Sequence, residues 1–265
     1  MATFQEPYIG ATDFTTRAQV EEAKPCINKA SGRRLHVGAM MSRKTYLGLP
    51  TASGWEKIWL DEAGRKALFI EDQEVFNVLH FAAYGPDGPQ TKLEHLLGAT
   101  DSCGPGLHGL QLDMIWPDVE LVQAFKEKRP DLSLILQVSH QAIDRVKHKE
   151  GGFVEVARRY KDFLSYLLVD FGMGRGIPFD PDSARVYLER LTEIYPEDHL
   201  AIGGGLGPTT YMNLETLVAR FPLLSWDAQG KMRTSGNALD PIEMPLVCTY
   251  LEKSSSLAAN YWPHQ

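Results

Sequence analysis

Eight short apolar segments rich in β-forming residues recur along the chain, spaced roughly 30 residues apart on average. They begin near Tyr8, Leu35, Asn77, Leu107, Leu132, Phe163, His199 and Leu223. A step of about 30 residues accommodates one strand, one helix and two loops. Near-continuous apolar strands are typical of a parallel sheet whose outer face is covered by helices.

Eight such units predict an α/β protein, specifically a closed (β/α)₈ TIM barrel that uses residues 1–265 as a single domain. The alternative is a doubly wound open sheet, which usually carries a glycine-rich phosphate loop after its first strand. Residues 11–17 follow the first strand here, with the sequence ATDFTTR and no glycine. The sequence therefore favours the barrel.

The segments between the strands carry helical signals. Asp118 is the predicted N-cap of a helix that Pro130 ends. Residues 42–55 are predicted to form a long loop after the second strand, and a loop of that length is often functional. Residues 254–265 are predicted to form a surface strap.

Composition excludes several classes of function. Lys and Arg number 27 against 34 Asp and Glu, a net charge of −7, which argues against a nucleic-acid partner. No apolar run approaches the roughly 20 residues that span a bilayer, and the first residues lack a secretory signal pattern. Cys26, Cys103 and Cys248 are an odd number, far apart in sequence, so we expect no disulfide framework and a cytoplasmic protein.

Glycines mark the ends of the last two predicted strands. Gly204 and Gly205 lie in the segment AIGGGLGP, and Gln229 and Gly230 lie in WDAQGK. Barrels often hold a phosphate with the loops after strands seven and eight, because exposed backbone N–H groups bind the dianion. The alternative is that these glycines only make tight turns.

Asp170 ends the sixth predicted strand, at the mouth of an apolar barrel. Partial desolvation there would raise the pKa of its carboxyl and suit it to general acid catalysis. The alternative is a capping role or an ion pair with Arg175. The glycine-rich residues 172–180 that follow could cover a ligand, but Ile177 interrupts the dinucleotide fingerprint.

Other polar residues stand at predicted strand ends. Thr12 and Asp13 end the first strand, and each is either a catalytic group or a hydrogen-bonded or capping residue. Asp113 ends the fourth strand. Arg43 and Lys44 follow the second strand and either bind a substrate anion or form a solvated turn. The remaining strand-end candidates are His80, Tyr84, Gln111, Gln137, Ser139, His140 and Asp227.

No cofactor or metal is expected from the motifs. His80, His108 and His140 show neither HxxxH nor HExxH spacing. The chain also contains neither the GxSxG sequence of a serine nucleophile nor a P-loop.

Five short motifs occur in the order found in one known family. They are ATDFTTRAQVEEA at the first strand, LQLDM at the fourth, LLVDFGMGRGIPFD at the sixth, GGGL at the seventh and SWDAQGK at the eighth. Taken together, the chain resembles phosphoribosylanthranilate isomerase, in the ribulose-phosphate-binding barrel superfamily. The resemblance spans nearly the whole chain, although each motif is short.

The resemblance implies roles for particular residues. Asp170 would be the general acid, and Gly204, Gly205, Gln229 and Gly230 would bind the substrate phosphate. An isomerase of this family would use no cofactor.

One departure from the family lies at the first strand. The family's general base is a cysteine, and Thr12 stands in its place, with a hydroxyl that is a far weaker base than a thiol. Asp13, or Asp113 in place of a family histidine, could supply a carboxylate instead. Arg43 is the nearest counterpart of the family's arginine after the second strand.

Two functions therefore remain open. The first is an enzyme that acts by proton transfer on a small phosphorylated substrate, as an isomerase or a related lyase or epimerase. The second is a non-catalytic barrel that binds a phosphorylated ligand and has lost the base. A barrel without any ligand is a third possibility, and the oligomeric state is not predicted.

Overall fold

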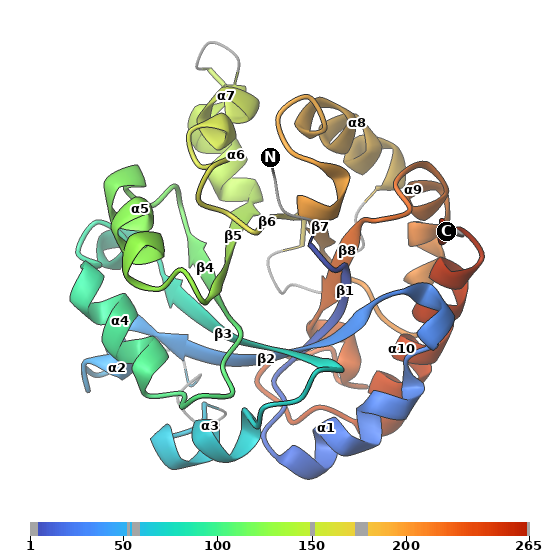
Figure 1. Cartoon of the computed structure of the whole chain (residues 1–265), viewed down its shortest axis with the longest axis horizontal. Helices are drawn as coiled ribbons and strands as arrows, with labels where there is room; N and C mark the ends of the chain where they lie inside the picture. The colour runs from blue at the N-terminus through green and yellow to red at the C-terminus, as the bar shows by residue number, and fades with distance from the viewer. Residues whose placement is uncertain (1–4, 52–53, 55–58, 149–151, 173–179, 264–265) are drawn as a thin grey trace.

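The computed structural model describes residues 5–51, 54, 59–148, 152–172 and 180–263. Eight parallel strands close into a barrel in sequence order, with helices around the outside (Figure 1), so the predicted (β/α)₈ fold is confirmed. The strands are β1 (Tyr8–Thr12), β2 (Arg34–Ser42), β3 (Val75–Ala83), β4 (Gly109–Met114), β5 (Ser133–Ser139), β6 (Tyr166–Asp170), β7 (Leu200–Gly203) and β8 (Ser225–Ala228).

The described helices lie between these strands in the chain. The α-helices are α1 (Arg17–Ala23), α2 (Arg43–Tyr46), α3 (Glu62–Leu68), α4 (Leu93–Asp101), α5 (Val119–Lys128), α6 (His140–Val146), α7 (Gly152–Arg158), α8 (Pro181–Leu191), α9 (Glu215–Arg220) and α10 (Met244–Ala259). The short 3₁₀ turns are η1 (Lys24–Cys26), η2 (Lys29–Ser31), η4 (Gly85–Asp87), η5 (Glu197–His199), η6 (Tyr211–Leu214) and η7 (Gly230–Met232). Among the described residues, no helix combines the length and the apolar character needed to cross a bilayer.

Most local signals are confirmed. Asp118 caps α5, because its carboxylate accepts a hydrogen bond from the Glu120 N–H at 3.0 Å. The predicted loop at 42–55 was wrong at its start, where Ser42 accepts a hydrogen bond from the Thr45 N–H and begins the short helix α2. Part of that segment, residues 52–53 and 55, lies outside the described residues.

The predicted C-terminal surface strap was also wrong, because its first residues belong to α10. Ser254 and Ser255 are fully buried in that helix. Their hydroxyls donate to the carbonyls of Tyr250 and Leu251, one turn earlier, at 2.7 and 2.6 Å. These local hydrogen bonds allow serine inside a buried helix, although its polarity favoured a surface segment.

The lower part of the barrel interior is closed by apolar side chains. These side chains point inward from five strands and form a cluster separate from the main core: Tyr8, Phe76, Val78, Ile135, Tyr166, Leu168 and Ala201. The ring of Tyr8 lies 5.7 Å from that of Phe76 and 5.0 Å from that of Tyr166, between centroids. The amino-terminal end is thus filled, as in other barrels, and chemistry is confined to the opposite end.

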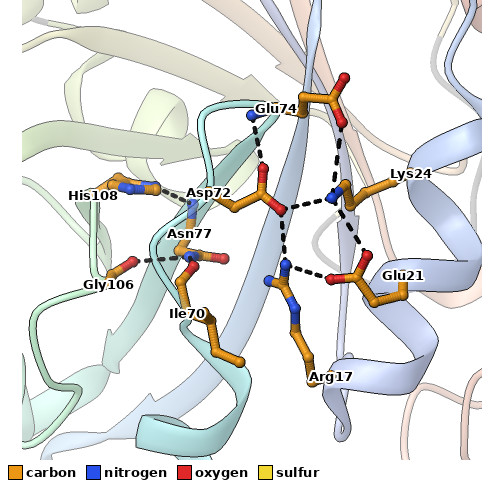
Figure 2. A network of polar contacts seen from close by, with 9 residues as sticks. All are labelled: Arg17, Glu21, Lys24, Ile70, Asp72, Glu74, Asn77, Gly106 and His108. Carbon is orange, nitrogen blue, oxygen red and sulfur yellow. Dashed lines mark hydrogen bonds and ion pairs between the residues drawn. The ribbon is translucent and has the colours of Figure 1, made fainter.

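A polar network holds α1 against the segment that leads into β3 (Figure 2). The Asp72 carboxylate accepts hydrogen bonds from Arg17 Nη2 and Lys24 Nζ, each at 2.7 Å, and from the Glu74 N–H at 2.9 Å. Glu21 pairs with both Arg17 and Lys24. Only 13% of the Asp72 side chain is exposed, so its partners replace most of its hydration.

Asn77 ties together two turns ahead of β3 and β4 (Figure 2). Its fully buried side-chain amide donates to the carbonyls of Ile70 and Gly106 at 3.0 and 2.8 Å. Its backbone N–H donates to His108 Nδ1 at 3.0 Å. His108 therefore has a structural role at the closed end of the barrel.

We predict that Asp72→Asn lowers the free energy of unfolding by about 1–2 kcal/mol at neutral pH. Burial alone would raise the pKa of Asp72, but the hydrogen bonds from Lys24 and its neighbours outweigh it and hold the pKa below its usual value. A depressed pKa contributes stability that is present above about pH 4 and lost as the pH falls through the folded value. The difference between the two proteins should therefore shrink in acid.

Urea unfolding at a series of pH values measures this effect. Glu62→Gln is the control, since that carboxylate pairs with Lys66 in α3 but is fully exposed. The control should change stability little at any pH. A Glu62→Gln effect as large as that of Asp72→Asn would contradict the assignment.

Candidate active site

A cavity opens at the carboxyl end of the barrel, where residues from β1, β3, β5, β6, β7 and β8 meet. It holds about 430 Å³ of space, including its open mouth. Six of the nine predicted site residues line this one cavity: Thr12, Asp170, Gly204, Gly205, Gln229 and Gly230. The three others, Asp13, Asp113 and Arg43, lie outside its lining.

Two carboxylates stand at the same height in this cavity. Asp170 at the end of β6 is in register with Gly203 on β7, and Gly203 is in register with Asp227 on β8. Gly203 has no side chain to place between them. Two strand spacings separate the aspartates, so their Cα atoms are about 10 Å apart, a distance that two carboxyl groups can bridge through a small substrate.

The Asp170 carboxylate accepts hydrogen bonds from both β5 and the segment after β6. The Gly172 N–H donates to Oδ1 and Gln137 Nε2 donates to Oδ2, each at 2.8 Å. Donors of this kind favour the ionised carboxylate. The alternative partner Arg175 and the interrupting Ile177 lie outside the described residues.

The hydrogen bonds continue from Gln137 around the barrel wall. Gln137 Oε1 accepts from Gln111 Nε2 at 2.8 Å, and the same nitrogen lies 3.3 Å from His80 Nδ1. An ionised Asp170 accepts only, so it fixes the direction of both amides. The chain thereby connects the end of β6 to the end of β3.

His80 and Asp113 form a pair at the other end of this chain. His80 Nε2 lies 3.2 Å from Asp113 Oδ2, and the Tyr84 hydroxyl donates to Asp113 Oδ1. Burial would lower the pKa of His80, but the Asp113 carboxylate outweighs it and raises that pKa. His80 lines the cavity, and Asp113, which contacts it, is not among the lining residues.

Asp227 is the second carboxylate of the cavity and is 11% exposed. Burial is the main cause that raises its pKa to about 7, and the nearby Asp170 adds to the shift. Thr12 Oγ1 donates to both oxygens of Asp227, at 3.3 and 3.4 Å. A Cβ on Gly10, the register partner on β1, would lie 2.5 Å from Asp227 Oδ1, so only glycine leaves room for this carboxyl.

Glycines line the cavity beside the two carboxylates. Gly204 and Gly205 have φ angles of 120° and 60°, a conformation that side chains disfavour. The Thr210 hydroxyl donates to the Gly205 carbonyl at 2.7 Å and fixes this turn. Within the described residues, the N–H groups of Gly205 and Gly230 donate no hydrogen bond, which leaves them available to an anion.

Asp13 is part of a clamp rather than of the cavity wall. Its Oδ2 accepts from Arg233 Nη2 at 2.5 Å and from Gln229 Nε2 at 3.1 Å. Arg233 also donates to the carbonyls of Gln229 and Asp240, at 2.7 and 2.5 Å. One oxygen of the Asp13 carboxylate thus holds the loop that contains Gly230, and a role for Asp13 as a base stays a prediction.

Arg43 lies at the start of α2 and pairs with Asp87 in η4. Its Nη1 donates to Asp87 Oδ1 at 3.1 Å, and Lys44 Nζ lies 3.3 Å from the other oxygen. The pair connects the β2 and β3 loops. The structure therefore does not bring Arg43 into the cavity that holds Asp170.

The sequence analysis did not single out three residues that line the cavity. Asp227, His80 and Gln137 appeared only as polar strand ends, although a charged residue within the apolar run LLSWDA was a usable signal. Arg233 carried no signal, since its partner is 220 residues away. Among the described residues, no three His, Cys, Asp or Glu side chains are grouped as a metal site would need.

The fold is shared with several solved structures. The phosphoribosyl anthranilate isomerase of Thermus thermophilus is 16% identical with a TM-score of 0.61, over 94% of this chain and 99% of that one. The N-(5′-phosphoribosyl)anthranilate isomerase of Pyrococcus furiosus is 10% identical with a TM-score of 0.60, over 94% and 99%. The predicted resemblance to this family is thus confirmed in the fold.

A barrel with a different activity is almost as similar. The catalytic domain of a hyperthermophilic chitinase from Pyrococcus furiosus is 13% identical with a TM-score of 0.58, over 98% of each chain. The sequence matches no protein-family model and no curated protein. Identities this low show the fold alone, so the reaction has to be argued from the site.

Proposed function

We propose that this barrel is an enzyme that moves protons within a small phosphorylated substrate, as an isomerase or a related lyase or epimerase. One observation carries the proposal. Asp170 and Asp227 flank Gly203 in a cavity that Gly205 and Gly230 also line, and the N–H groups of these two glycines donate no hydrogen bond within the described residues. An anion site beside two carboxylates is what a phosphorylated substrate of proton-transfer chemistry needs.

The phosphate end of the substrate lies at the loops after β7 and β8. Converging peptide dipoles hold a dianion well, and glycine lets the backbone approach it closely. The clamp of Asp13 and Arg233 keeps the second of these loops in place. Arg43 has no part in this chemistry.

The two carboxylates divide the acid and base roles. Asp227, with a pKa of about 7, holds its proton in a large fraction of molecules at neutral pH. Asp170 accepts hydrogen bonds from Gln137 and from the Gly172 N–H, and such donors favour the ionised carboxylate. Asp227 is therefore the proton donor and Asp170 the acceptor, the opposite of the acid role that the family resemblance gives Asp170.

In an isomerisation of the aminoaldose type, Asp227 would protonate the ring oxygen as the ring opens, and Asp170 would take the proton from C2. Thr12 is too weakly acidic to act as a base. Its hydroxyl instead orients the Asp227 carboxyl, which it contacts at 3.3 Å. Asp113 keeps His80 oriented at the cavity wall.

We predict that Asp170→Asn and Asp227→Asn each lower kcat about 100-fold or more in the conversion of N-(5′-phosphoribosyl)anthranilate, because each removes one proton-transfer group. Substrate consumption under saturating conditions measures the effect. Asp182→Asn on the exposed first turn of α8 is the control and should leave kcat unchanged. Turnover that survives both active-site changes would contradict the assignment.

Phosphate binding is tested separately by thermal denaturation with inorganic phosphate. We predict that phosphate at 100 times its Kd stabilises the protein by about 2.7 kcal/mol, and that Gly205→Asp abolishes this gain by charge repulsion. Gly205→Asn is the matched control, because both side chains tolerate positive φ but only aspartate is charged. Stabilisation without turnover would support the non-catalytic barrel, and equal behaviour of both variants would exclude the phosphate site.

The pH profile tests which carboxylate is the acid. We predict that kcat/KM falls as the pH rises through about 7, because Asp227 then loses the proton it donates. Thr12→Val removes a donor that favours the ionised form, so this limb should move to higher pH. Thr249→Val on the outer helix α10 should leave it in place. Activity that instead rises through pH 7 would make Asp227 the base.

A further inference from the structure

Two cysteines from opposite ends of the chain share one hydrogen-bond acceptor. Cys26 ends η1, directly after α1, and Cys248 lies in the second turn of α10. Cys26 Sγ is 3.5 Å and Cys248 Sγ 3.9 Å from the carbonyl oxygen of Glu22. Both thiols therefore point into the same gap between the first and last helices, which pack side by side (Figure 1).

We propose that Cys26 and Cys248 form a reversible intramolecular disulfide that links the α1–η1 segment to α10. Both thiols are free in this structure. Because they converge on a single oxygen from two packed helical segments, side-chain rotation alone can bring the sulfurs together. A cross-link between segments that met only after backbone movement would be strained.

The surroundings give the two thiols different roles. Cys248 is partly exposed, whereas Cys26 is 8% exposed. Burial, with a contribution from the adjacent Cys248 thiol, raises the pKa of Cys26 to about 12. Cys248 is therefore the thiol that meets an oxidant first, and Cys26 is the one that resolves the intermediate.

The reaction partner is a small-molecule disulfide such as oxidised glutathione. The Cys248 thiolate attacks one of its sulfurs and releases the first small thiol, which takes up the Cys248 proton. The Cys26 sulfur then attacks Cys248 Sγ, its proton passes to the second departing thiol, and the protein disulfide forms. Two protein thiols are oxidised while one small disulfide is reduced to two thiols.

The cross-link would close nearly the whole chain into one covalent loop. A disulfide over a loop this long removes much of the entropy of the unfolded chain. The helix it anchors, α10, packs against both β1 and η7, the turn that begins at Gly230. Oxidation would therefore stabilise the place where the barrel's first and last units meet.

Cys103 provides the internal control. It is fully buried in the segment after α4, and its Sγ donates to the Ala99 carbonyl at 3.4 Å. Within the described part of the chain, it forms no hydrogen bond with either of the other cysteines. Cys103→Ala should therefore leave the disulfide chemistry unchanged.

The experiment treats the reduced, folded full-length protein with oxidised glutathione, alkylates the remaining thiols and maps peptides by mass spectrometry. We expect loss of two thiols per chain, a linked Cys26–Cys248 peptide and an alkylated Cys103. The unfolding midpoint should rise by about 10 °C in the natural protein and in Cys103→Ala, and reductant should reverse the rise.

Cys26→Ser and Cys248→Ser should show no linked peptide and no rise in the midpoint. A stable glutathione adduct on Cys248 of the natural protein, or a disulfide between two chains on a non-reducing gel, would overturn the proposal. So would a linked peptide that leaves the unfolding midpoint unchanged. None of these outcomes depends on whether the barrel has the activity proposed above.

Discussion

Two carboxyl groups share one poorly solvated cavity at the mouth of a closed barrel. The hydrogen bonds that each accepts, set against the cost of its burial, determine much of the chemistry of the site. Asp170 accepts hydrogen bonds from Gln137 and from the Gly172 N–H, while Asp227 accepts one from the Thr12 hydroxyl and burial raises its pKa to about 7. When their environments give two carboxyl groups different pKa values, one can act as an acid and the other as a base. The apolar cluster below the site makes this possible by excluding water from that side.

A chain of hydrogen bonds supports the residues that line the cavity. Gln137 and Gln111 run from Asp170 toward His80, which Asp113 holds in turn. On the opposite side, Arg233 joins the ends of β1 and β8, because it donates to Asp13 and to the Gln229 carbonyl. Asp13, a candidate base in the sequence, contacts Arg233 and Gln229 in this structure.

The fold itself does not choose among reactions. Isomerase and chitinase barrels superpose on this chain with similar scores, and both are less than 20% identical to it. What separates the possibilities is a small set of atoms: two carboxyl groups, two glycine N–H groups and a threonine where the family has a cysteine. The pair of thiols between α1 and α10 also depends on closure of the barrel. Closure places the first and last helices side by side, which brings Cys26 and Cys248 to the same carbonyl oxygen.

The sequence by itself determined the number and order of the strands, the cap at Asp118, the glycines after β7 and β8, and the candidacy of Asp170. Each of these is a local pattern of polarity or backbone freedom that a short window contains. Only the tertiary structure decided that Asp227 stands level with Asp170, that Asp13 pairs with Arg233, and that Cys26 meets Cys248. These depend on the register and closure of the barrel, which are set by the packing of the whole sheet and leave no mark in the neighbouring residues.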